Sequence, residues 1–570
     1  MPRTAASPAG LFAAAVTFLL LVLFSPLVAA PFWSPRAALL LVVAAVGLPT
    51  LVRLWWSDAR SAAMAATGFV AVAALSTAVS PEPLLALIGP YGWGTGLLFV
   101  AAVAGAWAIG TAVSSSEARL VERAFLAGVL VNAAVAILQT AVDLGITELA
   151  LFDGRAGALV GNPVQLGAVA VAGFALVAWR LHGVPPAAAP RWLPVALPAA
   201  AAIELSGSRF ALGVAVLVVA VAVLRRRIRM AALLAATLVG GIAIGTFVAE
   251  VGTGEEAVSG TERVAADPAS GVTPRLETWM SAWHAVEDRP VLGAGPGRFR
   301  AATSRYRTLE LVRSQGPDSL FVDAHNMGVE YAVTTGLLGV AALGAWLALA
   351  VRGTGGPLLG ASLALFALHL VQPLGVEVTP LAFLTLGAAC PRPAPVTGTT
   401  RGAIGAALAG ALVAGGVLLA GDFRLDQAAL DFEAPQARAA DRLLPAWPEP
   451  ADVRARIHAF DGVANRRPDA LARAARFEHE AARRDPTNPL WWNRLGEIEL
   501  RLEQPLEARE RFREALLHDP WSVRALLGYS RASIAAGQPH GAVHALQRVL
   551  VAQPDNGAAR ELLKTAGGGG

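Results

Sequence analysis

The stretch from Asp323 to Gly339 reads DAHNMGVEYAVTTGLLG, and it marks the point where a long polar segment runs into an apolar one. Its spacing predicts a membrane helix with His325 at the mouth and with Gly336 and Gly339 on one face, where small residues let helices approach closely in lipid. The positive end of the helix dipole disfavours protonation of a first-turn histidine, so a neutral imidazole that can accept a proton is expected. The alternative is a histidine that only caps the helix or lies at the membrane interface.

Composition places most of the chain in a membrane. Hydrophobic residues make up 55% of the 570 residues, charged residues 15%, and the mean hydropathy is +0.53. These values exclude a soluble globule over most of the length. The net charge of +4 comes from arginine, since Lys564 is the only lysine, and no basic patch is interleaved with aromatic residues. No nucleic-acid partner is therefore expected. The single cysteine, Cys390, excludes an intrachain disulfide or thiolate cluster, and no metal-binding motif is present.

Apolar runs long enough to cross about 30 Å of hydrocarbon recur along the first 420 residues. They lie near residues 11–32, 37–56, 61–79, 95–112, 120–142, 160–181, 192–206, 209–224, 230–249, 326–350, 356–372, 376–390 and 402–420. Arginines concentrate in alternate connections, which predicts a cytoplasmic N-terminus and places the part after Gly421 outside the cytoplasm. We therefore expect an all-α fold with a polytopic bundle of about 12–13 membrane helices over residues 1–421.

The loop from 250 to 325 is the longest connection between these runs. Residues 252–271 are rich in Gly, Ser, Thr and Glu and are expected to be mobile. The next part, RLETWMSAWHAVE from Arg275 to Glu287, predicts a helix that lies along the membrane surface with its tryptophans at headgroup level. A glycine-rich turn follows at residues 291–297, directly before the segment that carries His325.

The C-terminal part is charged and repetitive. Asp485-Pro486 recurs as Asp519-Pro520, and Pro520 recurs as Pro554, at a period of 34 residues. This period is typical of tetratricopeptide repeats, so residues 451–564 are expected to form a soluble α-solenoid. Residues 422–450 are expected to be a linker and 565–570 a flexible tail. The concave face of such a solenoid is a candidate surface for a protein partner.

Arginines gather at helix ends on the predicted outer side. They are Arg155, Arg209, Arg275, Arg289 and the arginines from Arg298 to Arg307. An arginine at the mouth of a membrane helix costs free energy unless it meets water, a carboxylate or an anionic ligand. Snorkelling to headgroups, or pairing with Glu204, Glu277 or Asp288, explains any one of them equally well. Taken together with a histidine at the same depth, they favour an anion site.

These motifs together resemble the O-antigen ligase and polymerase superfamily over about residues 60–390. The pattern His325-Asn326, nine residues, Gly336, two residues, Gly339 fits the ligase motif, in which H is followed by N, S or Q, nine residues and GxxG. The other matching segments are SGSR ending at Arg209, Arg275 and Trp279 followed by RPVLGAGPGRF, and GRAGALVGNP with Arg155 and Asn162.

The resemblance implies a GT-C-like membrane glycosyltransferase that moves a glycan from undecaprenyl pyrophosphate to an acceptor hydroxyl, without a metal or other cofactor. It makes His325 the expected base, with Arg275 and Arg209 on the pyrophosphate, where positioned arginines stabilise developing charge. The further candidates for substrate binding are Arg155, Asn162, Asn326, Arg289 and Trp279. Asn326 would orient the histidine or a sugar hydroxyl, and Trp279 would pack on lipid or glycan.

The acceptor stays open at this point. The ligase motif favours a glycolipid, whereas a polymerase or a protein O-oligosaccharyltransferase would use nearly the same machinery, and the repeats could recruit a protein acceptor. The expected location is the inner, cytoplasmic membrane, with the repeats on the extracytoplasmic side. A non-enzymatic transporter or scaffold is the alternative from another class, and it is disfavoured because most predicted spans carry no charge near their middle.

Overall fold

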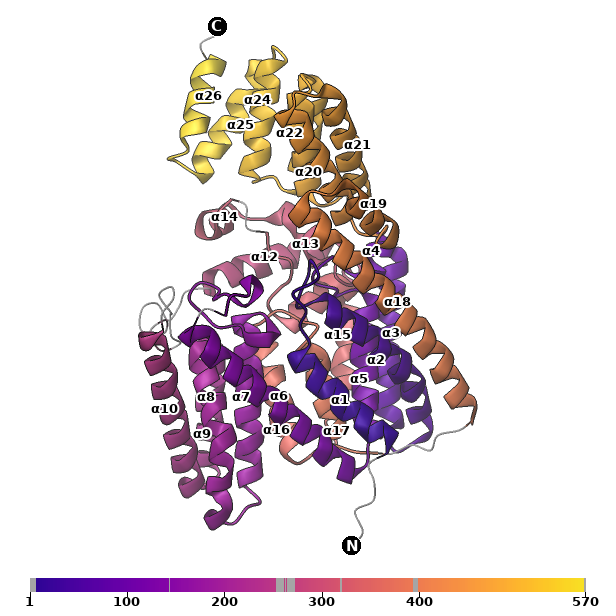
Figure 1. Ribbon diagram of the computed structural model, residues 1–570, viewed down its shortest axis with the longest axis vertical. Coiled ribbons are helices and arrows are strands. Elements are labelled where there is room, and N and C mark those ends of the chain that lie inside the picture. The colour runs from indigo at the N-terminus through magenta and orange to yellow at the C-terminus, as the bar shows by residue number, and fades with distance from the viewer. Residues whose placement is uncertain are drawn as a thin grey trace.

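The computed structural model describes residues 7–142, 144–252, 261, 263, 272–317, 320–392 and 398–567, and helices are the regular elements in these ranges (Figure 1). The expected all-α architecture is confirmed: a helical membrane bundle carries a helical repeat domain at one end. Most of the segment 252–271, which the sequence predicts to be mobile, lies outside the described residues.

Each predicted apolar run coincides with a helix of the bundle. The helices are α1 (Pro8–Val22), α2 (Ser34–Arg53), α3 (Arg60–Val79), α5 (Leu97–Ala112), α6 (Ser115–Ala141), α7 (Pro163–Leu181), α8 (Leu193–Leu205), α9 (Arg209–Leu224), α10 (Ile228–Val251), α15 (Met327–Ala350), α16 (Pro357–Leu368), α17 (Thr379–Ala388) and α18 (Gly398–Asp431). Among the described helices, 7 are long and apolar enough to cross a membrane, and α1, α5, α9, α16 and α17 are shorter apolar helices.

Local sequence sets where these helices begin. At the start of α6, the hydroxyl of Ser114 accepts the N–H of Glu117, and the carboxylate of Glu117 accepts the N–H of Ser114. This reciprocal capping satisfies two backbone donors that a helix start leaves unpaired. The same carboxylate accepts the N–H of Ser7, which fixes the start of α1 beside the start of α6.

The arginine-rich connections gather at the end of the bundle away from the repeats. Arg180 makes a two-point ion pair with Glu122, and Arg392 donates to the backbone carbonyls of Asp58 and Arg352. The N-terminus lies at this end and the repeats at the other (Figure 1). The arginine-rich connections thus lie at the end opposite the repeats, which agrees with the positive-inside pattern. The side of the membrane that each end faces stays a prediction.

Helix α15 is broken at Gly336, where the sequence predicts a continuous helix with a packing face. Gly336 has φ 71° and ψ −179°, a conformation that only glycine adopts readily. The prediction of two glycines on one helical face is therefore wrong. The glycine-rich turn enters the break: Leu337 N–H donates to the carbonyl of Pro290 (2.8 Å), and Ala294 N–H donates to the carbonyl of Val333 (2.9 Å).

This insertion satisfies the backbone groups that the break exposes. Gly295 N–H donates to the carbonyl of Thr334 (2.9 Å), which also accepts the hydroxyl of Ser76 on α3 (2.8 Å). Irregular backbone at membrane depth is tolerated only where protein buries it and supplies hydrogen bonds. The turn at 290–295 is thus part of the bundle, and it fixes the loop that precedes His325.

The segment expected to be a linker, residues 422–450, is largely helical. Helix α18 continues to Asp431 and α19 (Ala434–Leu443) packs against it. Asp422 is fully buried, and its carboxylate accepts hydrogen bonds from the hydroxyls of Ser34 and Tyr91. The charge that marks the end of the last apolar run therefore ties α18 to the bundle.

The repeat domain is a stack of helix pairs. It comprises α20 (Glu449–Ala464), α21 (Pro468–Arg484), α22 (Pro489–Arg501), α23 (Pro505–His518), α24 (Val523–Ala535), α25 (Pro539–Ala552) and α26 (Gly557–Gly567). Phe512 is fully buried between neighbouring helices, and a Cβ at Gly496 or Gly528 would lie within 3.0 Å of its ring. Small residues at these positions therefore let adjacent repeats close around the ring.

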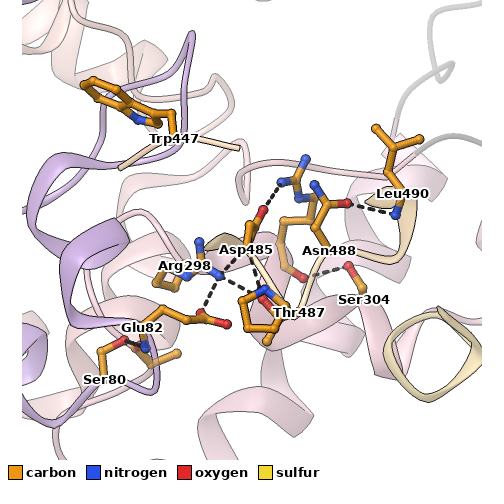
Figure 2. Close-up of polar contacts among 12 residues, drawn as sticks. Ser80, Glu82, Arg298, Ser304, Trp447, Asp485, Thr487, Asn488 and Leu490 are labelled. Carbon is orange, nitrogen blue, oxygen red and sulfur yellow. Dashed lines mark hydrogen bonds and ion pairs between the residues drawn. The ribbon is translucent and has the colours of Figure 1, made fainter. Parts of the chain in front are cut away.

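The repeats dock on the outer loop through buried ion pairs (Figure 2). Arg298 contacts Glu82 and, at 2.9 Å, Asp485, which is the first residue of one recurring Asp-Pro pair. Arg307 contacts Asp519, the equivalent residue one repeat later, also at 2.9 Å. Arg300 also pairs with Asp485, and Arg305 pairs with Asp288. All four arginines from 298 to 307, which the sequence grouped with the candidate anion site, are therefore bound to carboxylates.

The charges at this interface favour the paired state. Burial would raise the pKa of Asp485, but the positive charges of Arg298 and Arg300 outweigh it and hold that pKa below its ordinary value. Arg307 and Asp519 have side chains that are each only 3% exposed. Removing one member of such a pair leaves an uncompensated buried charge. The docking is therefore built into the fold and is not a loose tether.

Replacing Gly336 by alanine should destabilise the bundle. The new Cβ would lie 2.2 Å from the carbonyl oxygen of Val291, and the backbone conformation adds about 1–3 kcal/mol of strain. Gly344→Ala is the matched control, because Gly344 lies in the same helix and its Cβ would meet nothing within 4 Å. Thermal unfolding in detergent should show a lower Tm for Gly336→Ala alone; equal Tm values would contradict the broken helix.

Asp519→Asn should loosen the repeat domain from the loop. It leaves Arg307 buried without its carboxylate, at a cost of about 3–5 kcal/mol. Asp555→Asn, which removes the exposed partner of Arg560, should cost less than about 1 kcal/mol. Hydrogen exchange at α14 (Leu309–Gln315) reports the docking, since its Val312 packs on the repeats. Unchanged protection in Asp519→Asn would rule out this pair as an anchor.

Candidate active site

His325 lies at the entrance of α15 in a loop that is fixed from several sides. Its φ of 51° is left-handed, which is uncommon for a residue with a side chain. Asp323 Oδ1 accepts the N–H of His325 (2.7 Å), and the carbonyl of Ala324 accepts the indole N–H of Trp279 (2.9 Å). The N–H of Ala324 donates to the carboxylate of Glu330 (3.0 Å). The backbone is thus held in a strained form that presents the imidazole.

The imidazole itself is part exposed and stands beside a carboxylate. Its side chain is 28% exposed, and Nδ1 lies 2.8 Å from Oδ1 of Asp323, at an angle that is not that of a hydrogen bond. The ring of Phe321 meets it edge-on, with centroids 5.5 Å apart. The loop thus presents an imidazole to solvent with a carboxylate directly beside it.

Four arginines gather next to this loop. A Cβ on Gly207 would lie 2.6 Å from Cδ of Arg155 and 3.2 Å from Cδ of Arg263, so these two side chains enclose the turn before α9. The guanidinium of Arg275, on α12 (Val272–Asp288), lies 5.0 Å from the ring centre of Phe210, the neighbour of Arg209. The side chains come from the loop before α7, the outer loop, α9 and α12.

Electrostatics show that the four charges repel one another. Burial, and then the charge of Arg263, lower the pKa of Arg155, and Asp153 offsets this only in part. Burial, and then the charge of Arg209, lower the pKa of Arg275, with Asp323 opposing. The buried Nε atoms of Arg155 and Arg263 have no hydrogen-bond acceptor among the residues that the structure describes. Clustered guanidinium groups of this kind suit an anion such as phosphate, which they bind bidentately.

The structure brings together only part of the residues expected from the sequence. His325, Arg275, Arg209 and Arg155 lie in one connected group through Asp323 and Arg263. Arg289 does not join them: it is exposed just beyond the C-terminal end of α12, about 20 Å along the helix from Arg275. The physical reason is that the thirteen residues between Arg275 and Arg289 are helical, so the rise of the helix carries the two arginines apart.

The side chains of Asn326, Asn162 and Trp279 make hydrogen bonds to backbone groups of the protein. Asn326 caps α15, accepting the N–H of Val329 (3.0 Å) and donating to the carbonyl of Leu370 (2.9 Å). Asn162 caps α7 in the same way through Val164 (2.8 Å). Because both atoms of its amide are bound to backbone, Asn326 does not orient the histidine side chain here. Trp279 holds the backbone beside the histidine rather than a lipid.

Two members of the group were missed by the sequence reasoning. Arg263 lies in the segment 252–271, which the sequence predicts to be mobile. It is the single arginine of that segment, and this is the sequence feature that could have identified it. Glu204 is fully buried on α8, and its carboxylate accepts hydrogen bonds from the N–H (3.1 Å) and the hydroxyl of Thr261. Because Arg263 follows Thr261 by two residues, these hydrogen bonds also hold Arg263 close to α8. Asp323 is the second such residue, and its position two residues before His325 is the sequence feature that allows the observed turn. Among the described residues, no group of three or more His, Cys, Asp and Glu side chains is arranged so that it could hold a metal ion.

The fold and this group of side chains define a polytopic helical membrane protein with an arginine-rich site under a fused repeat domain. Residues 194–344 match the family model described as O-Antigen ligase, and residues 499–565 match a tetratricopeptide repeat model. Residues 194–344 thus match the O-antigen ligase family and residues 499–565 match tetratricopeptide repeats, as the resemblance predicted. The matched segment contains Arg209, Arg263, Arg275 and His325.

No curated protein matches the chain. A solved structure named Arabidopsis OM64 TPR domain is similar at 21% identity and a TM-score of 0.18, covering 20% of this chain and 96% of its own.

Arg263→Ala should weaken the binding of inorganic pyrophosphate to the purified protein. Loss of one charged hydrogen-bond donor costs about 1.5–3 kcal/mol, which corresponds to roughly a 10–100-fold rise in Kd. Arg289→Ala is the matched control, because it removes an exposed arginine from the same loop outside the group. Isothermal titration at low salt measures both. A larger effect of Arg289→Ala than of Arg263→Ala would show that the anion binds elsewhere.

Proposed function

We propose that the protein transfers a glycan from undecaprenyl pyrophosphate to an acceptor hydroxyl on the extracytoplasmic side of the inner membrane, without a metal. The family match supports a membrane glycosyltransferase-like function. The observation that carries the finer proposal is the juxtaposition of a part-exposed imidazole with four guanidinium groups at one mouth of the bundle.

The residues suit each change of charge in the reaction. The bond between the anomeric carbon and the pyrophosphate oxygen breaks, and the electron pair stays on that oxygen. Arg209, Arg263 and Arg275 would stabilise the resulting negative charge, which is greatest in the transition state and product. The acceptor oxygen forms the new bond to the anomeric carbon, and its proton passes to His325. Asp323 would stabilise the imidazolium that results.

The position of α12 supports a substrate that arrives from the bilayer. Leu276, Met280 and Trp283 lie at helical spacing, and each is more than half exposed. An apolar strip on a helix beside the anion group suits contact with lipid, and this supports the predicted location of α12 at the membrane surface. A polyprenyl tail could therefore stay in the bilayer while its diphosphate meets the arginines.

The alternatives differ in the acceptor and not in the chemistry. A polymerase would extend a second lipid-linked glycan, and a protein O-oligosaccharyltransferase would modify Ser or Thr. The repeats dock on the loop that carries Arg298 and Arg307 and leads to His325, so a partner that they recruit would arrive next to that loop. A transporter or scaffold would show no transfer at all.

Transfer should fail when the base or the anion group is removed. The purified protein in nanodiscs is given a labelled undecaprenyl-pyrophosphate glycan with glycolipid, glycan or protein acceptors. His325→Ala should abolish most of the rate, and Arg275→Ala should lower it about 10²–10³-fold. Arg229→Ala, at the opposite end of the bundle, should leave the rate unchanged. Full activity in His325→Ala would remove it as the base, and no transfer by the native protein to any acceptor would contradict the proposal.

A further inference from the structure

An apolar groove runs along the outside of the bundle between α7, α9, α10 and α16. Its volume is about 350 Å³, and its walls include Leu217 on α9 and Leu363 on α16. These two side chains are 55% and 47% exposed. The buried residues of α9 are all small, namely Ala211, Ala215 and Ala222. The protein therefore leaves this flank of α9 open to a hydrocarbon chain.

The groove has the length of one leaflet of a bilayer. On α9 its lining runs from Val214 to Arg225, which is about 16 Å at the rise of an α-helix. This is close to half of the roughly 30 Å of hydrocarbon in a bilayer. Arg225 stands just beyond the last residue of α9, and Trp179 on α7 also lines the groove. Arginine and tryptophan are residues that favour the headgroup level.

A polar space continues the groove at its arginine end. It has a volume of about 470 Å³, shares His182 and Met230 with the groove, and is lined by Arg226 and Arg227. Within the described part of the chain, the side chains of Arg225, Arg226 and Arg227 make no ion pair or hydrogen bond. The buried Nε2 of His182 likewise has no hydrogen-bond partner among the described residues. The space therefore offers cationic donors that the described protein does not use.

The turn that carries these arginines has a backbone made for glycine. Arg226 has a left-handed φ of 54°; its N–H donates to the carbonyl of Val223 (2.8 Å), and the N–H of Arg227 donates to that of Ala222 (3.0 Å). In this way of ending a helix, glycine is the usual residue at the left-handed position. A residue with a Cβ is less stable there than glycine. The backbone thus gives no reason for an arginine at position 226, whereas an anion site does.

The lining also selects the class of ligand. The described residues that line the groove and the polar space include neither Asp nor Glu. A choline or ethanolamine headgroup would therefore bring its cation to arginines without a carboxylate to receive it. A phosphate diester without a cation suits guanidinium groups, which bind phosphate oxygens bidentately. Free phosphate would use the polar space alone and leave the groove unfilled.

From this geometry we propose that one anionic glycerophospholipid of the phosphatidylglycerol class binds here. Its phosphate diester contacts Arg225, Arg226 and Arg227, and one acyl chain lies in the groove between α9 and α16. The site does not depend on the proposed transfer reaction. Because α9 begins at Arg209 and ends beside Arg225, the lipid holds the far end of the helix that carries one arginine of the candidate active site.

Native mass spectrometry of the full-length, delipidated protein measures this binding. Dioleoyl-phosphatidylglycerol should saturate a single site, and it should bind more tightly than dioleoyl-phosphatidylcholine or dioleoyl-phosphatidylethanolamine. Glycerol phosphate should bind more weakly, because it has no chain to fill the groove. Equal affinity for a zwitterionic lipid would overturn the role of the arginines. Glycerol phosphate that binds as tightly as the lipid would overturn the role of the groove.

Arg226→Gly separates lipid binding from folding. It should raise the Kd for dioleoyl-phosphatidylglycerol about tenfold, the effect of one lost charged hydrogen bond. The Tm of the lipid-free protein should not fall, because glycine adopts the left-handed conformation readily. Arg60→Gln is the matched control: it changes an exposed arginine at the start of α3, on the other flank of the bundle (Figure 1), and should leave the Kd unchanged. Unchanged affinity in Arg226→Gly, or an equal loss in Arg60→Gln, would contradict the site.

Cross-linking locates the acyl chain. Phosphatidylglycerol with a photoactivatable diazirine on one chain is bound to the native protein and irradiated, and the labelled peptides are identified after proteolysis. Labels should concentrate in residues 209–224 and 357–368, which are α9 and α16. In Figure 1, α2 and α18 lie on the flank opposite α9 and α10. Labelling concentrated on α2 and α18 would place the lipid elsewhere and overturn the proposal.

Discussion

The break in α15 at Gly336 is the constraint on which the outer half of the molecule depends. A helix interrupted inside a membrane exposes carbonyl and N–H groups that lipid cannot satisfy. The glycine-rich turn at 290–295 supplies the missing hydrogen bonds, and Ser76 supplies another. Because α12 lies before this turn and His325 lies just before the broken helix, the same hydrogen bonds fix two of the elements that carry the candidate site.

A second set of interactions, the buried ion pairs of the outer loop, holds the repeat domain against the bundle. The loop that follows the turn carries Arg298 and Arg307, and the repeats present Asp485 and Asp519 at their period of 34 residues. Matching charges at two successive repeats set the register of docking as well as its strength, because a shift by one repeat would leave buried charges unpaired. The repeat domain is therefore a cover attached to the loop that shapes the site.

Charge divides the outer face into two chemical environments. Around Arg155, Arg263 and Arg275 the positive groups outnumber the nearby carboxylates, and burial strengthens their mutual repulsion. Around Gln165 and Glu377 the polar groups are neutral or negative and aromatic rings stand beside them. The first environment suits an anion such as the diphosphate of the proposed donor, and the second has no positive charge among its described lining residues to offer one.

The sequence by itself determined the helices of the bundle, the repeats and the resemblance to the O-antigen ligase family, because these depend on hydropathy, on a fixed period and on short motifs along the chain. It also selected His325, Arg209, Arg275 and Arg155, because each belongs to a short motif next to a predicted membrane helix or in the outer loop. Only the tertiary structure decided the rest. Gly336 breaks its helix because a distant turn fills the gap, Arg298 and Arg307 are bound because the repeats fold back on them, and Arg263 joins the site because Glu204 holds its neighbour. Each of these depends on a partner far away in the sequence, and one-dimensional spacing contains no information on which distant group will meet a buried charge.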